Sequence, residues 1–414
     1  MTLSSLLTAL GITKHPAFWD ALYPAAALEY AAQGCVYVSE AFLKALDAEY
    51  DAFGECRDVA FATAVKIREN ENLMRFIVVL AHAFKDPKSV YADFASIELP
   101  PVPDGADPLP YELTAFYGLL STVHAEARAL RARSVPEDIL RVTVQGHAFS
   151  ITVFRSRHDR LGYDTGRISW CLNFAPPSNA LTIGRFTFAP SKFDYPVTVF
   201  ERIDGSGAGA ERYRVLMRGV KLHRTGLILG SPGCEDEDGA YDADFIETNT
   251  YYEGYPPRPT VPGKPASADN VRIRLKKSEW QVVLQKDDGY LVTHIPERWP
   301  FDHETILASY RRAREVYAHC YPDLGIRALH CRTWLLAPQM QGFLKPDANL
   351  VRFQNDYILY PCVCNGKAVF SFLFLKPFES YDELPENTTL QREVKKIYLR
   401  GEVLYETAGF NFTE

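Results

Sequence analysis

Two residues in the second half of the chain have side chains suited to proton transfer or nucleophilic attack. His294 lies near the end of an apolar run, two residues before Pro296. A histidine there can accept a proton from an amine, because its pKa lies near neutral pH. Cys331 follows His330 on a later apolar run, so a nucleophilic Cys–His pair is an alternative. A strand histidine bonded only to backbone is the plain alternative for His294, and no third orienting group accompanies Cys331.

The elements that must position these residues form a strand–turn–helix–strand unit. An apolar run, Leu291–Ile295, ends at Pro296, and a second run, Ile326–Leu336, follows later. Asp302 after a proline is a good helix N-cap. A helical stripe of apolar residues follows it, at spacings of four, three and four: Ile306, Tyr310, Ala313 and Tyr317. The helix between the runs predicts a right-handed crossover, with the two strands as parallel neighbours.

The start of this helix is a candidate anion site. Free backbone N–H groups and the positive end of the helix dipole would face the end of the preceding strand. Most units of this kind bind nothing at that corner, so the pattern alone leaves both alternatives open.

Composition excludes several classes of protein. The 414 residues favour two domains, or three, and the formal net charge of −7 argues against nucleic-acid binding. No run approaches the ~18 apolar residues of a membrane span, and the N-terminus has no basic start typical of a signal peptide. We therefore expect a cytoplasmic protein with no membrane or nucleic-acid partner.

Neither the cysteines nor the glycines predict a metal or cofactor motif. The eight cysteines are scattered, which in a long chain without an export signal favours reduced thiols. Cys362 and Cys364 share one face of a strand-like run and are interpreted as small buried hydrophobic residues rather than metal ligands. The stretch Arg202–Gly207 matches a short pyrophosphate-binding pattern, R-x-x-G-x-G, but strand-like residues follow it, which favours a hairpin loop.

The distribution of residue types along the chain predicts an α+β fold in two domains. Residues 1–160 carry apolar residues at helical spacing and predict a helical N-terminal domain. Residues 161–414 become rich in β-branched and aromatic residues from Leu181 onward, which predicts a mixed, mostly antiparallel sheet with flanking helices. Leu350–Val363 and Ala368–Leu375 are among its expected strands. Residues 231–270, acidic and rich in proline, are interpreted as a long surface excursion.

Several motifs together resemble a known family. The stretch THIPERWPF, then HETILASYRRAREVY, then CRTWLLAPQ resembles the C-terminal domain of bacterial GNAT-like acyltransferase-domain proteins. Three further segments are similar to the same family: LTIGRFTF around Gly184 and Arg185, NLVRFQNDYIL around Gln354, and TTLQREVKKIYLRG. The helical first part of the chain resembles the N-terminal domain that accompanies this domain.

The resemblance implies an acyl-CoA or acetyl-CoA donor and direct transfer of the acyl group to an amine acceptor, without a metal. Strand residues from Val292 to His294 would align the pantetheine arm, with His294 as the general base. The turn and helix start would meet the pyrophosphate, and the candidate residues there are Pro296, Glu297, Arg298 and Asp302. The candidate contacts for the acceptor or acyl group are Arg185, Arg332, Trp334 and Gln354.

The sequence also departs from the family pattern. The glycine-rich pyrophosphate loop is missing between Pro296 and Asp302, and Arg298 replaces the glycine that usually follows H-I-P-E. Two alternatives therefore stay open: a non-catalytic ligand-binding or scaffold protein that keeps the fold, and an acyl hydrolase centred on Cys331.

Overall fold

A computed structural model describes residues 1–85, 97–163, 166–174, 179–209, 211–257, 271–297 and 299–412. The chain forms two compact units, Met1–Ile183 and Gly184–Glu414. The sequence placed the domain boundary near residue 160. The helix α11 and the short strand β1, which lie beyond that point, belong to the first unit.

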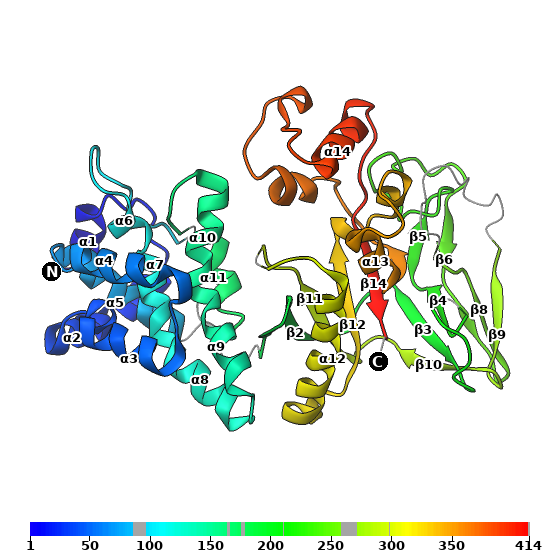
Figure 1. The fold of residues 1–414 in the computed structure, drawn as a ribbon, viewed down its shortest axis with the longest axis horizontal. Coiled ribbons are helices and arrows are strands. Elements are labelled where there is room, and N and C mark those ends of the chain that lie inside the picture. Colours follow the sequence, from blue (N-terminus) through cyan, green and yellow to red (C-terminus); the bar gives the residue numbers. More distant parts are fainter. Residues whose placement is uncertain are drawn as a thin grey trace. The chain divides into compact units, whose positions relative to one another are not determined.

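The first unit is helical, which confirms the fold class expected for it (Figure 1). Its helices are α1 (Leu3–Ala9), α2 (Phe18–Gln33), α3 (Glu40–Tyr50), α4 (Arg57–Ile67), α5 (Glu71–Lys85), α6 (Leu109–Glu112), α7 (Thr114–Leu119), α8 (Val123–Ala132), α9 (Glu137–Val144), α10 (Gly146–His158) and α11 (Gly166–Cys171), and the strand β1 (Leu181–Ile183) ends it.

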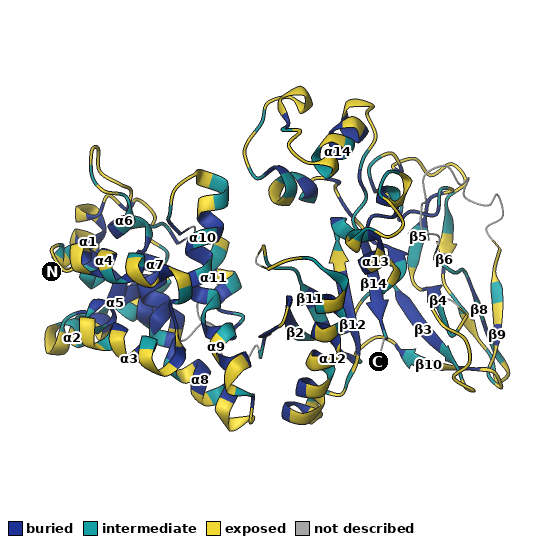
Figure 2. Ribbon diagram, viewed as in Figure 1, coloured by how far each residue is buried: buried dark blue, intermediate teal, exposed yellow. Residues whose placement is uncertain are grey.

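Helix α5 forms the centre of this unit, as its burial in Figure 2 shows. Its run of apolar side chains packs against α2 and α7. Gly118 of α7 allows the close approach, because a Cβ there would come within 2.8 Å of the Leu80 Cβ. Larger residues would push the two helices apart, so this glycine fixes the packing distance.

The second unit contains most of the strands. They are β2 (Phe186–Lys192), β3 (Val197–Arg202), β4 (Tyr213–Met217), β5 (Val220–Leu222), β6 (Tyr241–Ala243), β7 (Ile246–Glu247), β8 (Tyr251–Gly254), β9 (Ile273–Lys276), β10 (Trp280–Leu284), β11 (Gly289–His294), β12 (Ile326–Thr333), β13 (Ile358–Pro361) and β14 (Thr407–Asn411). Its helices are α12 (His303–Cys320), α13 (Asn349–Asn355) and α14 (Thr389–Leu399).

The main sheet of this unit has the order β2-β11-β12-β14-β13. Only the pair β11–β12 is parallel among these neighbours, and the other pairs are antiparallel. The parallel pair confirms that the two runs joined by α12 are parallel neighbours, as the sequence predicted. The order is therefore that of a mixed, mostly antiparallel sheet, as expected from the sequence.

Both faces of the main sheet are covered. On one face, Tyr310 of α12 stacks on Phe186 at 5.4 Å between ring centroids, and the Tyr317 hydroxyl donates to the Phe188 carbonyl at 2.8 Å. On the other face, Tyr290 and Phe410 belong to a buried cluster that includes residues of β3 and β4. The strands β10-β3-β4 form a second sheet.

Three segments differ from the sequence-based expectation. The segment expected as one strand, 350–363, begins as α13 and only then forms β13. Residues Phe370–Phe374 are a helical turn instead of a strand. The described part of the expected surface excursion, 231–257, contains β6, β7 and β8, of which β8 pairs with β9 and buries Tyr252 beside Phe200. Tyr252 thus joins this segment to a buried cluster shared with β3, β4, β9 and β10. Residues 258–270 lie outside the described part.

Candidate functional site

The strands β11 and β12 stop pairing before either strand ends. Their registered pairs run from Gly289–Ile326 to Val292–His330. Two further residues of β11 and three further residues of β12 follow the last pair. On its other side, β11 stays paired with β2 through His294 and Thr187. Beyond the last registered pair, the Cys331 thiol still contacts the Thr293 carbonyl at 3.4 Å. The ladder of backbone pairs between β11 and β12 has nevertheless ended there.

The chain then turns from Pro296 into α12. The Asp302 carboxylate accepts the Thr305 backbone N–H at 2.8 Å, which confirms Asp302 as the N-cap. That bond also lowers the pKa of the Asp302 carboxyl. Glu297 is exposed, and Arg298 lies outside the described residues. Since α12 has 18 residues, its first turn has a substantial positive dipole end.

His294 is half-buried at the end of β11, on the same face of the sheet as Val292. Burial lowers the pKa of His294 to about 4. Its imidazole is therefore neutral at pH 7 and carries a lone pair that can accept a proton. The same shift makes it a weaker base than an ordinary histidine.

His330 is fully buried on β12, opposite Val292. Its Nε2 lies 2.7 Å from the Tyr360 hydroxyl, and its ring packs 4.3 Å from the Tyr195 ring, centroid to centroid. Burial, with a smaller effect from the Arg332 charge, lowers the pKa of His330 to about 3. These contacts support a neutral core histidine, whose partner Tyr360 is 30 residues away in sequence.

Cys331 lies in the core on the opposite face of β12. It is 1% exposed, and its thiol donates to the Thr293 carbonyl at 3.4 Å. Burial raises the pKa of the Cys331 thiol. A thiol that is protonated, bonded and enclosed is a poor nucleophile, because the thiolate is the reactive form. The structure does not bring a charged histidine to it, since His330 points to the other face.

The four candidate contact residues do not gather around one point. Arg185 is buried, and its Nη1 donates to the Pro296 carbonyl at 2.7 Å. Arg332 is partly exposed and donates to the Val363 carbonyl at 2.6 Å. Trp334 is buried in a core cluster with Met340. Arg185 therefore lies at the β11–α12 turn, whereas Trp334 supports the fold.

Gln354 of α13 also has a structural set of bonds. Its amide donates to the carbonyls of Leu335 and Ala337 at 2.8 and 3.0 Å, and its oxygen accepts from Gln341 at 3.1 Å. These bonds tie α13 to the turn that follows β12. They leave Gln354 little capacity to bind a substrate.

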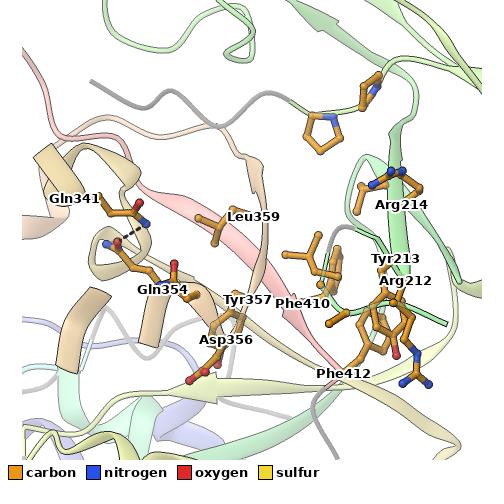
Figure 3. A pocket seen from close by; sticks show the side chains of 18 residues that line it. Arg212, Tyr213, Arg214, Gln341, Gln354, Asp356, Tyr357, Leu359, Phe410 and Phe412 are labelled. Atoms are coloured by element: carbon orange, nitrogen blue, oxygen red, sulfur yellow. Dashed lines mark hydrogen bonds between the residues drawn. The ribbon is translucent and has the colours of Figure 1, made fainter. Parts of the chain in front are cut away.

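A cavity of about 790 Å³ lies beside β13, the edge strand of the main sheet. Figure 3 shows aromatic and charged side chains around it: Arg212, Tyr213, Arg214, Asp356, Tyr357, Phe410 and Phe412. Its volume suits a small molecule. In the main sheet, β12 and β14 lie between β11 and β13. The cavity is therefore at the β13 edge of the sheet, although one of its wall residues reaches the start of α12.

One link connects that cavity wall with the helix start. The Nε2 of His303, the first residue of α12, lies 2.9 Å from an Asp356 carboxylate oxygen. Burial raises the pKa of Asp356, and His303 partly opposes this. The pair is 53 residues apart in sequence, so no local spacing could have indicated it.

The helical unit holds a buried cluster that the sequence did not single out. Glu126 and His147 are 0% and 1% exposed, and a Glu126 oxygen lies 2.9 Å from His147 Nε2. The Cys171 sulfur lies 2.9 Å from the Tyr163 hydroxyl and 3.3 Å from that of Ser150. Burial alone raises a thiol pKa, but the His147 bond and charge lower the pKa of Cys171 below its ordinary value. The cluster is polar and enclosed away from solvent.

Two classes of feature are absent from the described part of the chain. No group of three or more histidine, cysteine or acidic side chains among those residues could hold a metal ion. Within the same ranges, no helix is both long and apolar enough to cross a membrane.

Comparison with solved structures places the fold. The whole chain is similar to an acyltransferase in complex with decanoyl-CoA and teicoplanin, with a TM-score of 0.59 and 16% identity over 99% of both chains. It is similar to an acyltransferase in complex with CoA and 10C-teicoplanin, with a TM-score of 0.58 and 16% identity over 99% of both chains. It is also similar to an acyltransferase in complex with decanoyl-CoA, with a TM-score of 0.56 and 16% identity over the full length of both chains. At this identity the likeness shows the fold.

Among curated proteins, no sequence matches this chain significantly. A family model does match, over residues 181–411, which is more than half of the chain. The matched region begins at β1, spans the main sheet and includes the parallel pair β11–β12 with its crossover helix. The chain belongs to the family described as the GNAT-like C-terminal domain.

Proposed function

We propose that this protein transfers an acyl group from an acyl-CoA thioester directly to an amine. The observation that carries the proposal is the end of the β11–β12 ladder beside the start of α12. Backbone groups of strands that have stopped pairing can bond to an extended pantetheine arm, and phosphate oxygens suit a helix N-terminus. The related fold of acyltransferases that bind CoA or decanoyl-CoA supports the same donor class.

In the proposed reaction the amine nitrogen attacks the thioester carbonyl carbon. The C–N bond forms, the C–S bond breaks, and the CoA thiolate leaves and is protonated. Holding the two reactants together supplies most of the acceleration, and no metal is required for it. The acceptor is an amine of unassigned identity, and the length of the acyl chain is likewise unassigned.

His294 is the proposed proton acceptor, with a limited contribution. A base works best when its pKa lies near the working pH, and the pKa of His294 is about 4. An amine with a pKa near that of lysine, about 10.4, would have to lose its first proton to water before it reached this imidazole. His294 would then take the second proton as the C–N bond forms. We therefore place its effect near the lower end of the usual range for general bases, at about 10²-fold.

The geometry supports a structural role for Cys331. A covalent route would need its thiolate, and burial favours the protonated thiol. Direct transfer avoids that requirement, because the amine itself attacks the donor.

The test compares histidine variants in binding and in turnover. His294→Ala should leave CoA affinity, measured by calorimetry, within twofold and should lower turnover of an acyl-CoA with a panel of amines by about 10²-fold. His319→Ala is the matched control, since His319 is exposed in the last turn of α12. Its turnover should equal that of the parent.

Three results would count against this proposal. Equal turnover of His294→Ala and the parent would remove His294 from the mechanism. Loss of turnover in Cys331→Ser, with His294→Ala unaffected, would favour the covalent route. If the parent bound no acyl-CoA at millimolar concentration, the protein would be a binding or scaffold protein that keeps the fold.

A further inference from the structure

Arg185 holds its charge at the corner where β11 meets α12. It follows Gly184 in the turn that leads into β2, and its backbone N–H donates to the Ser309 hydroxyl of α12 at 2.8 Å. Its Nη1 donates to the Pro296 carbonyl at 2.7 Å. Its guanidinium carbon lies 5.3 Å from the centre of the Phe301 ring, one residue before the N-cap of α12. Contacts on three sides therefore fix the position of this cation.

This buried cation has no acidic partner among the described residues. Arg185 is 5% exposed, and its Nε is buried with no hydrogen-bond partner. Burial lowers the pKa of Arg185 to about 10, and no neighbouring carboxylate opposes that effect. Lys395, another buried cation of the same unit, shows the contrast. Its Nζ bonds to two carbonyls and to the Glu386 carboxylate.

A buried charge without a partner is costly, and an anionic ligand offsets that cost. The guanidinium lies beside Phe301, which precedes the N-cap of an 18-residue helix, and the positive end of that helix adds to its charge. The carboxylates of Asp302, Glu304 and Asp356 oppose both, although Asp302 is bonded to the Thr305 N–H and Asp356 contacts His303. The remaining first-turn N–H groups have no partner within the helix. Two independent positive features thus converge on one corner.

We propose that Arg185 binds the pyrophosphate of the acyl-CoA donor and replaces part of the glycine-rich loop that this chain lacks. Its planar fork suits phosphate oxygens, which a backbone loop would otherwise bind. The inference rests on the proposed function, because it assigns a role within the same donor site. It also separates Arg185 from the acceptor, which the sequence had associated with it.

The test uses three probes with the full chain: CoA, 3′-dephospho-CoA and inorganic pyrophosphate. Arg185→Met should weaken CoA and 3′-dephospho-CoA alike by about 10- to 100-fold in calorimetry, the scale of a lost charged hydrogen bond. It should also abolish detectable binding of pyrophosphate. Arg185→Lys keeps the charge but not the fork, so its loss should be smaller. The control is Arg327→Met, which removes an exposed cation paired with Asp288 and should change none of the three affinities.

Salt dependence separates a phosphate contact from a mere anchor of the turn. Raising KCl should weaken CoA binding to the parent more steeply than binding to Arg185→Met, because the parent has one more charge contact to screen. Equal salt dependence in the two proteins would overturn the proposal. Loss of the bond to Pro296 alone would weaken CoA binding but would leave its salt dependence unchanged. If Arg185→Met failed to fold, Arg185→Gln, which also removes the charge, would be used for the same comparison.

The remaining outcomes distinguish this inference from the proposed function. If Arg185→Met bound CoA as tightly as the parent does, the role of Arg185 would be overturned, and the proposed function would be unaffected. A variant defect confined to CoA, with 3′-dephospho-CoA unaffected, would move the contact to the 3′-phosphate and overturn the pyrophosphate assignment. If the parent bound pyrophosphate through Arg185 but not CoA, the anion site would stand and the acyltransferase proposal would fail.

Discussion

At Gly184, the addition of a single methyl group should measurably lower the free energy of unfolding. Its φ of +58° lies in the left-handed region, and a Cβ there would come within 2.3 Å of the Ser309 hydroxyl. That hydroxyl cannot easily move, because it donates to the Thr305 carbonyl at 2.7 Å and accepts the Arg185 N–H at 2.8 Å. Gly184→Ala should therefore combine backbone strain with a steric clash.

A matched glycine separates these two effects. Gly325 has a φ of +57°, but a Cβ there would meet nothing within 4 Å. Left-handed strain costs roughly 1–2 kcal/mol, and the stiffer unfolded chain returns about 0.4–1 kcal/mol. Gly325→Ala should thus lose about 1 kcal/mol. Overpacking adds roughly 1–3 kcal/mol, so Gly184→Ala should lose about 2–4 kcal/mol.

The measurement is urea unfolding of both variants, followed by circular dichroism. Two compact units can unfold separately, and the transition that shifts in Gly325→Ala identifies the C-terminal one. In the double variant Gly184→Ala/Ser309→Ala, part of the loss should be recovered, because the nearest atom would then be the residue 309 Cβ, at 3.1 Å. Equal losses for the two glycine variants would refute the steric argument.

Three further predictions concern buried groups. Cys331→Ser should keep at least half of the parent turnover while lowering stability by about 1–3 kcal/mol, because a polar hydroxyl replaces a buried thiol; abolished turnover would contradict its structural role. Glu126→Gln should lower the free energy of unfolding in urea by about 3–5 kcal/mol, since it leaves the buried His147 without its carboxylate. The control Glu137→Gln, at an exposed pair, should lower it by less than about 1 kcal/mol. Similar losses for the two variants would argue against the buried pair. The unfolded chain binds a proton at His330 below pH 6.5 and the folded protein only near pH 3, so this histidine destabilises the fold as the pH falls through that window. His330→Phe should therefore reduce the loss of stability between pH 6.5 and pH 5 by about 2 kcal/mol, and an unchanged pH dependence would show that His330 is protonated in the folded state.

The sequence predicted the elements whose signals are local and strong. Asp302 marked the start of α12, and the helix between two apolar runs required parallel neighbours, which β11 and β12 are. Thr388 and Gln391 likewise form the capping box expected at the start of α14. In each case one stretch of chain carries both the signal and the contact that it produces.

Short apolar runs were ambiguous for a physical reason. The residues Phe370–Phe374 are apolar at nearly every position, so no period separates a strand from a helical turn. The strand prediction for the segment before β13 was wrong for a different reason. Gln354 faces carbonyls of the turn after β12, and those tertiary bonds stabilise a helix there.

The candidate site was only partly predictable. The strand end and the helix start could be located, because they follow one another in the chain. Whether a histidine is protonated depends on burial by distant segments, as the lowered pKa of His294 illustrates. The pair Glu126–His147 and the contact between Arg185 and Pro296 span 21 and 111 residues, so neither has a local signature.

The position of β14 has a consequence for how the second unit can be made. This strand pairs with β12 on one side and β13 on the other, although it follows both in the chain. During synthesis, β13 therefore has no place in the sheet until residues 407–411 have left the ribosome. Until then two strand edges stay open, and such edges can pair with other chains. A truncation that removed β14 would therefore separate β13 from β12 and from the rest of the main sheet.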